Sequence, residues 1–67
     1  MAVLEQYEVW AFENNRWELV AGFFDQDVAS AVAQSRGSRV KLILAKYEDG
    51  DLVAQELIAE IGHLRNM

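Results

Sequence analysis

The stretch YEVWAFENNRWELVAGFF, Tyr7 to Phe24, contains six of the seven aromatic residues of the chain, in apolar runs on either side of Asn14-Asn15. Aromatic and β-branched residues favour β-strands, in which successive side chains point to opposite faces. Asn14-Asn15 separates the two runs, and Asn tolerates the positive φ that a two-residue hairpin turn requires. The stretch therefore predicts a β-hairpin. A turn at these residues pairs Glu13 with Arg16, Phe12 with Trp17, Trp10 with Leu19, and Val9 with Val20.

Both faces of the predicted hairpin are apolar. One face consists of Trp10, Phe12, Trp17, Leu19, Ala21 and Phe23. The other consists of Tyr7, Val9, Ala11, Val20 and Phe24, with Glu13, Arg16 and Glu18 near the turn. If one face packs inside the domain, the other remains as an exposed apolar patch, and such patches usually mark contact sites. The pattern leaves open which face is core, so the candidate interface includes residues of both: Tyr7, Val9, Trp10, Phe12, Trp17, Val20 and Phe24.

The next segment, DQDVASAVAQSRG, predicts a short α-helix. Asp25 suits the N-cap, and Asp27 places negative charge in the first turn, where the helix dipole favours it. Val28 and Val32 lie one turn apart, with Ala29, Ala31 and Ala33 around them, and together they give a narrow apolar stripe that can approach a sheet closely. Gly37 follows as a stop signal. A helix of this size is expected to cover one face of a sheet and leave the other open.

Two interpretations remain open for the C-terminal third. Residues 40–47 are rich in strand-forming residues, and Asp49-Gly50 is a strong hairpin turn. Residues 51–61 instead contain many helix formers, with Asp51 as a possible N-cap, so this element is either a fourth strand or a helix. Residues 62–67 are expected to be a flexible tail. The hairpin interpretation pairs Tyr47 with Leu52, Leu42 with Leu57, and Arg39 with Glu60, and gives a core face of Val40, Leu42, Leu44, Val53, Leu57 and Ala59.

The order of short motifs resembles a group of short proteobacterial proteins with a hairpin–helix–hairpin layout and no characterised function. The motifs are Tyr-Glu-Val at 7–9, Arg-Trp at 16–17, Phe23-Phe24 before an alanine-rich helix, and Val40-Lys41. The resemblance covers most of the chain. It implies four strands, carries over no functional residue and names no activity.

The length of 67 residues gives a single domain spanning 1–67, which we predict to be an α+β protein. Its expected order is strand–strand–helix–strand–strand, with one helix on one face of a small antiparallel sheet. The chain has no Cys and one His, so neither disulfides nor a metal are expected to reinforce its small core. The first residues lack the features of a signal peptide, and no apolar run approaches the roughly 18 residues that span a bilayer. A cytoplasmic location without a membrane partner is expected.

The net charge of −5 argues against long-range attraction to nucleic acids or anionic membranes. Basic residues concentrate in 36–46, and Arg36, Arg39 and Lys41 form a candidate basic patch. This patch follows the C-terminal end of the predicted helix, whereas anions prefer helix N-termini. A nucleic-acid partner is therefore not expected.

Catalytic and metal-binding chemistry is also not expected. The chain has no Cys or Thr, and its one His, His63, falls in the predicted tail, away from any serine nucleophile. Placing Gly50 at the sixth position of a calcium-binding loop puts Ala45 and Tyr47 at the first and third positions, where carboxylates are needed. We predict no catalytic residue, metal ligand or cofactor.

The sequence favours a non-enzymatic protein–protein interaction module that forms a homodimer through its aromatic-rich sheet. A second hypothesis is an inhibitor of the phage or mobile-element type, whose acidic surface would block a nucleic-acid-binding partner. A third is a weak binder of nucleic acid or a small ligand through Trp10, Arg16 and Trp17, since aromatic side chains can stack on bases.

Overall fold

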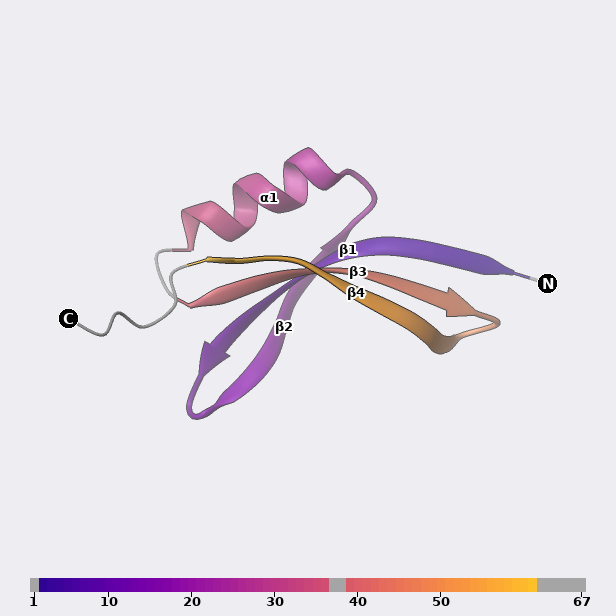
Figure 1. Ribbon diagram of the computed structural model, residues 1–67, viewed down its shortest axis with the longest axis horizontal. Helices are drawn as coiled ribbons and strands as arrows, with labels where there is room; N and C mark the ends of the chain where they lie inside the picture. Colours follow the sequence, from indigo (N-terminus) through magenta and orange to yellow (C-terminus); the bar gives the residue numbers. More distant parts are fainter. Residues whose placement is uncertain (1, 37–38, 62–67) are drawn as a thin grey trace.

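The computed structural model describes residues 2–36 and 39–61. The elements follow in the order β1 (Val3–Glu13), β2 (Arg16–Phe23), α1 (Gln26–Ser35), β3 (Val40–Glu48) and β4 (Asp51–Ile61). The strands form one antiparallel sheet in the order β2-β1-β3-β4, and α1 lies against one face of it (Figure 1). The α+β prediction is confirmed, and residues 51–61 are a strand rather than a helix. The predicted stop at Gly37 and the tail at 62–67 lie outside the described residues.

Both hairpins turn where the sequence predicts. Asn14 and Asn15 have φ of 57° and 65°, and Asp49 and Gly50 have φ of 52° and 89°. Two consecutive positive φ angles give the turn whose twist matches that of the flanking strands. Asn and Asp adopt this conformation at lower cost than most residues, and Gly at the lowest.

The register of the first hairpin matches the prediction near the turn and departs from it farther away. Val9 pairs with Ala21, while Trp10 pairs with Leu19, so Val20 is an extra residue in β2. The predicted pair of Val9 with Val20 is therefore wrong. A β-bulge of this kind shifts the alternation by one position, and a one-residue shift moves every later side chain to the opposite face. Ala21 and Phe23 consequently lie on the face of Val9, not on that of Trp10.

The second hairpin carries two such irregularities. Tyr47 pairs with Leu52 as predicted, but Leu42 pairs with Ala59 and Ile43 with Leu57. The predicted pair of Leu42 with Leu57 is wrong, because Val53 and Ile58 are the extra residues of β4. Glu60 correspondingly pairs with Lys41 instead of Arg39. The bulges move Leu57 out of the predicted core face, whereas Val40, Leu42 and Ala59 remain on the face toward α1.

The helix begins as predicted, and the alanine part of its predicted apolar stripe contacts the sheet. An Asp25 side-chain oxygen accepts hydrogen bonds from the backbone N–H groups of Asp27 (2.8 Å) and Val28 (3.4 Å). Ala29 and Ala33 are buried, whereas Val28 is 46% exposed and Val32 is only partly buried. Alanine lacks the bulk that would hold the helix away from the sheet, so Ala29 and Ala33 of the predicted stripe face the strands. Val32 packs at the edge of this contact, and Val28 points away from it.

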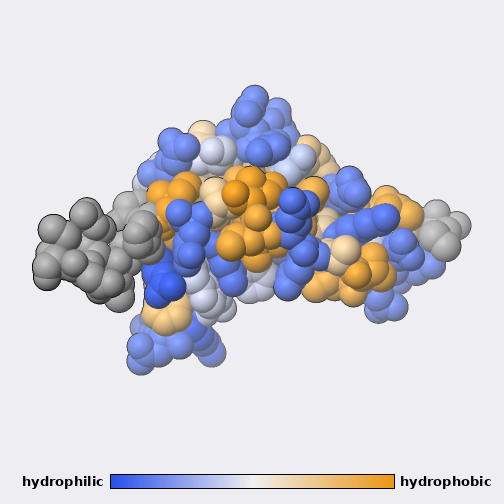
Figure 2. Space-filling model, viewed as in Figure 1, coloured by the Kyte–Doolittle hydropathy of each residue, from blue (hydrophilic) through white to orange (hydrophobic). Residues whose placement is uncertain are grey.

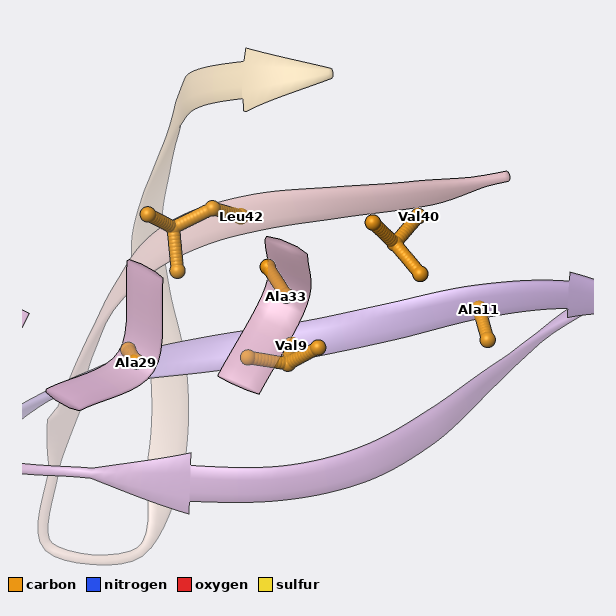
Figure 3. Packing of buried hydrophobic residues seen from close by; sticks show 6 residues of the cluster. All are labelled: Val9, Ala11, Ala29, Ala33, Val40 and Leu42. Carbon is orange, nitrogen blue, oxygen red and sulfur yellow. The ribbon is translucent and has the colours of Figure 1, made fainter. Parts of the chain in front are cut away.

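The core lies between α1 and the two central strands. Ala29 and Ala33 of the helix sit over the buried side chains of β1 and β3 (Figure 3). The buried sheet residues of this cluster are Val9, Ala11, Val40 and Leu42. Side chains at the edge of the cluster are partly buried against it: Tyr7, Val20, Phe23, Val32, Ile58, Ala59 and Ile61.

The sheet extends well beyond the helix. The principal dimensions are 48 × 24 × 16 Å, so the molecule is elongated. In Figure 1, the start of β1 and the β3–β4 turn project to the right, past the end of α1. We call this part, residues 2–6 and 45–55, the distal arm. Val3, Leu4, Leu52 and Val53 are exposed on it, and hydrophobic surface is visible over it in Figure 2.

Candidate interaction surface

The sheet face turned away from α1, which we call the open face, carries most of the large side chains of the protein. Residues directly opposite each other in an antiparallel pair share a face, so the register defines its members. Leu19 and Leu57, on the two edge strands, are 51% and 58% exposed. The open face consists of Leu4, Gln6, Glu8, Trp10 and Phe12 from β1, Trp17 and Leu19 from β2, Lys41, Ile43, Ala45 and Tyr47 from β3, and Leu52, Gln55, Leu57 and Glu60 from β4.

A buried carboxylate lies in the middle of the open face. Glu8 is only 2% exposed and accepts three hydrogen bonds from neutral donors. The donors are Gln6 Nε2 at 2.9 Å, Trp10 Nε1 at 3.0 Å and the Tyr47 hydroxyl at 2.5 Å. The bond from Tyr47 joins β3 to β1, and the bonds from Trp10 and Tyr47 fix the orientation of these two aromatic side chains.

The pKa of Glu8 reflects two opposing effects. Burial raises it, but the hydrogen bonds from Tyr47, Gln6 and Trp10 stabilise the carboxylate and together bring the pKa below the ordinary value. The hydrogen bond to Glu8 in turn raises the pKa of Tyr47, with burial and the charge of Glu8 acting in the same direction. The pair is therefore a charged glutamate held by a neutral tyrosine at neutral pH.

Cationic and aromatic side chains meet at the end of the open face opposite the distal arm. Phe12 and Trp17 pack edge-to-face with their ring centroids 5.3 Å apart. The Arg39 guanidinium carbon lies 5.2 Å and 5.3 Å from the two ring centroids, and Lys41 Nζ lies 4.3 Å from that of Trp17. At these distances each cation interacts favourably with the ring. This arrangement places the positive charge of the open face directly beside its aromatic surface.

A cleft of about 370 Å³ opens beside this cluster. The residues that line the cleft come from β2, β3 and β4 and from the residue that precedes β3: Trp17, Arg39, Lys41, Ile43, Gln55, Leu57 and Glu60. The Glu60 carboxylate lies 3.4 Å from Arg39 Nη2 and partly neutralises this side chain. Arg39 Nε is buried and has no hydrogen-bond partner among the described atoms. A separate hollow of about 400 Å³ lies on the distal arm, lined by Ala2, Leu4, Gln6, Tyr47 and Gly50.

The residues predicted as an interface fall on different surfaces. Trp10, Phe12 and Trp17 lie on the open face. Tyr7, Val9 and Val20 pack on the helix side, and Val9 is completely buried there, so it is not available for a partner. Phe24 follows β2 and is 75% exposed. The structure thus divides the predicted set between the core, the open face and the connection to α1.

The candidate basic patch is also divided. Arg39 and Lys41 lie side by side at the open-face cleft. Arg36 instead caps the end of α1 and forms an ion pair with Glu13 at 3.2 Å. Its charge is offset by that acid at the tip of the first hairpin.

Sequence reasoning missed the hydrogen-bonded cluster around Glu8. The signal was present, because strict alternation along β1 places Gln6 and Glu8 on the same face as Trp10 and Phe12. A charged residue within an apolar face indicates that local donors satisfy it. Tyr47, however, is 39 residues away in sequence and could be assigned only once the pairing of β1 with β3 was known.

The described residues, 2–36 and 39–61, hold no group of three or more His, Cys, Asp or Glu side chains suited to a metal ion. Within the same ranges, no helix has the length and apolar character needed to cross a bilayer. Comparison of the chain with protein-family models, with curated proteins and with solved structures found no match.

Proposed function

We propose that this protein is a non-enzymatic protein–protein interaction module that self-associates through the open face of its sheet. The observation that supports this most directly is that one short helix covers the other face, while Leu19, Leu57 and the aromatic side chains between them lie on a face without a second layer. Burying apolar surface contributes roughly 25 cal/mol per Å², so covering the exposed leucines and partly exposed aromatic rings of this face favours association.

The edges of the sheet are less suited to association than its face. β2 and β4 are the edge strands, and each contains bulged residues: Val20 in β2, and Val53 and Ile58 in β4. Bulges twist an edge and disrupt the regular row of backbone donors and acceptors that another strand would pair with. Face-to-face packing of two sheets therefore accounts for the open face better than edge-to-edge extension of the sheet does.

A second copy of the chain is the occupant that fits this face most simply. A symmetric dimer needs one self-complementary patch, and twofold dimers are the commonest protein assemblies. Two sheets packed face to face would enclose a second apolar layer that a 67-residue chain does not build alone.

Sedimentation velocity over a range of concentrations tests this proposal. We expect the native protein to sediment as a dimer and Leu19→Lys to sediment as a monomer, because a charge placed in the buried sheet face would be desolvated without a partner. Val28→Lys is the matched control, since Val28 has a similar exposed fraction (46% against 51%) but lies on the helix. A folded native protein that stays monomeric at every concentration would refute the proposal.

A further inference from the structure

The cleft beside Trp17 carries more positive than negative charge. Two cations, Arg39 and Lys41, and one carboxylate, Glu60, line it, so their charges sum to one positive charge. Glu60 lies 3.4 Å from Arg39 Nη2. Among the residues that the structure describes, Lys41 has no carboxylate oxygen within 4.0 Å, and its ammonium group lies over the Trp17 ring. A chain of net charge −5 thus keeps an excess positive charge in a concave site.

The open face itself supplies no free carboxylate to balance this charge. The acids that the register places on it are Glu8 and Glu60. Glu8 is 2% exposed and accepts three hydrogen bonds, and Glu60 is already in an ion pair. Glu48 and Asp51, beside the β3–β4 turn, form a cross-strand pair on the helix-side face. A second copy packed by its open face would therefore bring no free carboxylate to Lys41, and the balancing anion comes from a different molecule.

The cleft places apolar surface directly beside its charge. Lys41 and Glu60 form one cross-strand pair, and Ile43 and Leu57 form the next pair along the same face. The two pairs lie roughly 7 Å apart, the length of two strand residues. Leu57 is 58% exposed, and Gln55 adds an amide that can donate or accept a hydrogen bond. The cleft volume of about 370 Å³ is within the range of small-molecule sites.

We infer that this cleft binds a small organic monocarboxylate with an apolar body. The carboxylate lies against Lys41 and Arg39, and the body packs on Ile43 and Leu57. Within the described residues, the Arg39 side chain donates one hydrogen bond, from Nη2 to Glu60, so Nη1 keeps donors for a carboxylate. One negative charge balances the one excess positive charge, which favours a monoanion over a phosphate monoester, whose charge is close to two. The cleft is complete in a single chain, so this inference does not depend on self-association.

Titration of the native protein with octanoate at neutral pH, followed by NMR, tests the inference. We expect the Trp17 indole resonance and the amides of Ile43 and Leu57 to shift, and the amides of Ala29 and Ala33, in the helix, to stay unchanged. Octanol has the chain without the charge, and acetate has the charge without the chain. Each should bind at least ~10-fold more weakly than octanoate, because each makes only one of the two contacts. If octanol or inorganic phosphate binds as strongly as octanoate, the inference is wrong.

Substitution of Lys41 gives a second test. Lys41→Gln should raise the dissociation constant of octanoate by ~10-fold or more, because a charge-assisted contact is lost, whereas Lys41→Arg should stay within about threefold of native. Lys46→Gln is the matched control, since Lys46 is on the same strand but on the helix-side face, 4.0 Å from Glu48, and should stay within about twofold. Native affinity in Lys41→Gln would contradict the inference.

Sedimentation of the same native samples separates this inference from the proposed function. A native protein that dimerises but does not bind octanoate would overturn the inference and leave self-association standing. A native protein that binds octanoate at the cleft and stays monomeric would support the inference and refute self-association. The comparison of ligands on the native chain does not depend on the folding of any variant.

Discussion

Glu8 is the residue whose environment differs most from what its chemistry would suggest. A carboxylate that is almost fully buried on a sheet face is costly unless donors replace its hydration shell. Here three neutral donors do so, and the pKa of Glu8 falls below its ordinary value despite burial. The consequence is a hydrogen-bonded centre of the open face, in which Trp10 and Tyr47 have fixed orientations.

The Glu8→Gln variant tests this centre. In the variant, an amide NH₂ group replaces one carboxylate oxygen and cannot accept the hydrogen bonds that this oxygen accepts. We therefore expect a loss of about 2 kcal/mol in the free energy of unfolding at neutral pH. A group whose pKa is lowered on folding stabilises the native state above its unfolded pKa, about 4.3 for Glu, and loses that contribution as the pH falls through the folded pKa. The difference between native and variant, measured by urea denaturation, should therefore shrink as the solution becomes acidic. An unchanged difference at low pH would contradict this account.

The same pair makes a reciprocal prediction for Tyr47. Because the hydrogen bond to Glu8 and the charge of Glu8 raise the pKa of Tyr47, the Glu8→Gln variant should bring the pKa of Tyr47 down toward the ordinary value of a tyrosine. NMR titration of the ring resonances measures this directly.

At the scale of the elements, close approach of α1 to the sheet determines which face is covered. Ala29 and Ala33 contact the strands because their side chains are small, and the larger Val28 is left exposed. The bulges at Val20 and Ile58 bring additional side chains of the edge strands onto this face, where both pack against the core. The core beneath this short helix is thus enlarged by bulged residues of the edge strands and not by bulky side chains of the helix.

Enlarging this contact should be destabilising. We expect Ala33→Leu to lower the free energy of unfolding by about 1–3 kcal/mol, since added methyl groups would force the helix away from Val9 and Val40. Ala31→Leu, on the exposed side of the same helix, should have an effect within about 0.5 kcal/mol. Thermal or urea denaturation of the two variants at one protein concentration provides the comparison. Equal stability of the two would mean that α1 does not pack through its alanine side.

At the scale of the whole molecule, the chain forms one layered face and one open face. The helix covers only part of the sheet, and the distal arm extends past it with apolar residues on the outside (Figures 1 and 2). A domain of this size has a small core of its own, so burial of the open face would form a large share of the stabilising surface.

Folding and association should consequently be coupled. We expect the melting temperature to rise with protein concentration, because mass action stabilises an associating native state. The Leu57→Lys variant should melt lower and show no concentration dependence, since Leu57 is exposed on the open face. Differential scanning calorimetry at several concentrations measures both effects. If the melting temperature of the native protein does not depend on concentration, folding and association are not coupled and this prediction is wrong.

Local sequence determined the first four elements of this protein and left residues 51–61 open between a strand and a helix. The Asn14-Asn15 and Asp49-Gly50 turns and the Asp25 cap each act within a few residues, and each lies where it was predicted. The pairing near each turn was equally predictable, because the turn fixes the register of its nearest neighbours. The existence of one uncovered sheet face also followed, since one short helix can cover only one side.

Tertiary structure decided which face of the sheet stays uncovered. Bulges at Val20, Val53 and Ile58 have no local signature, because an extra residue is accommodated only when packing of the later side chains favours it. The position of β1 beside β3 brings Tyr47 to Glu8 and makes the Trp10 face the open one. The cleft of Trp17, Arg39 and Lys41 likewise assembles from strands β2 to β4. These contacts join residues far apart in the chain, so they depend on the free energy of the whole fold and not on the propensities of any one segment.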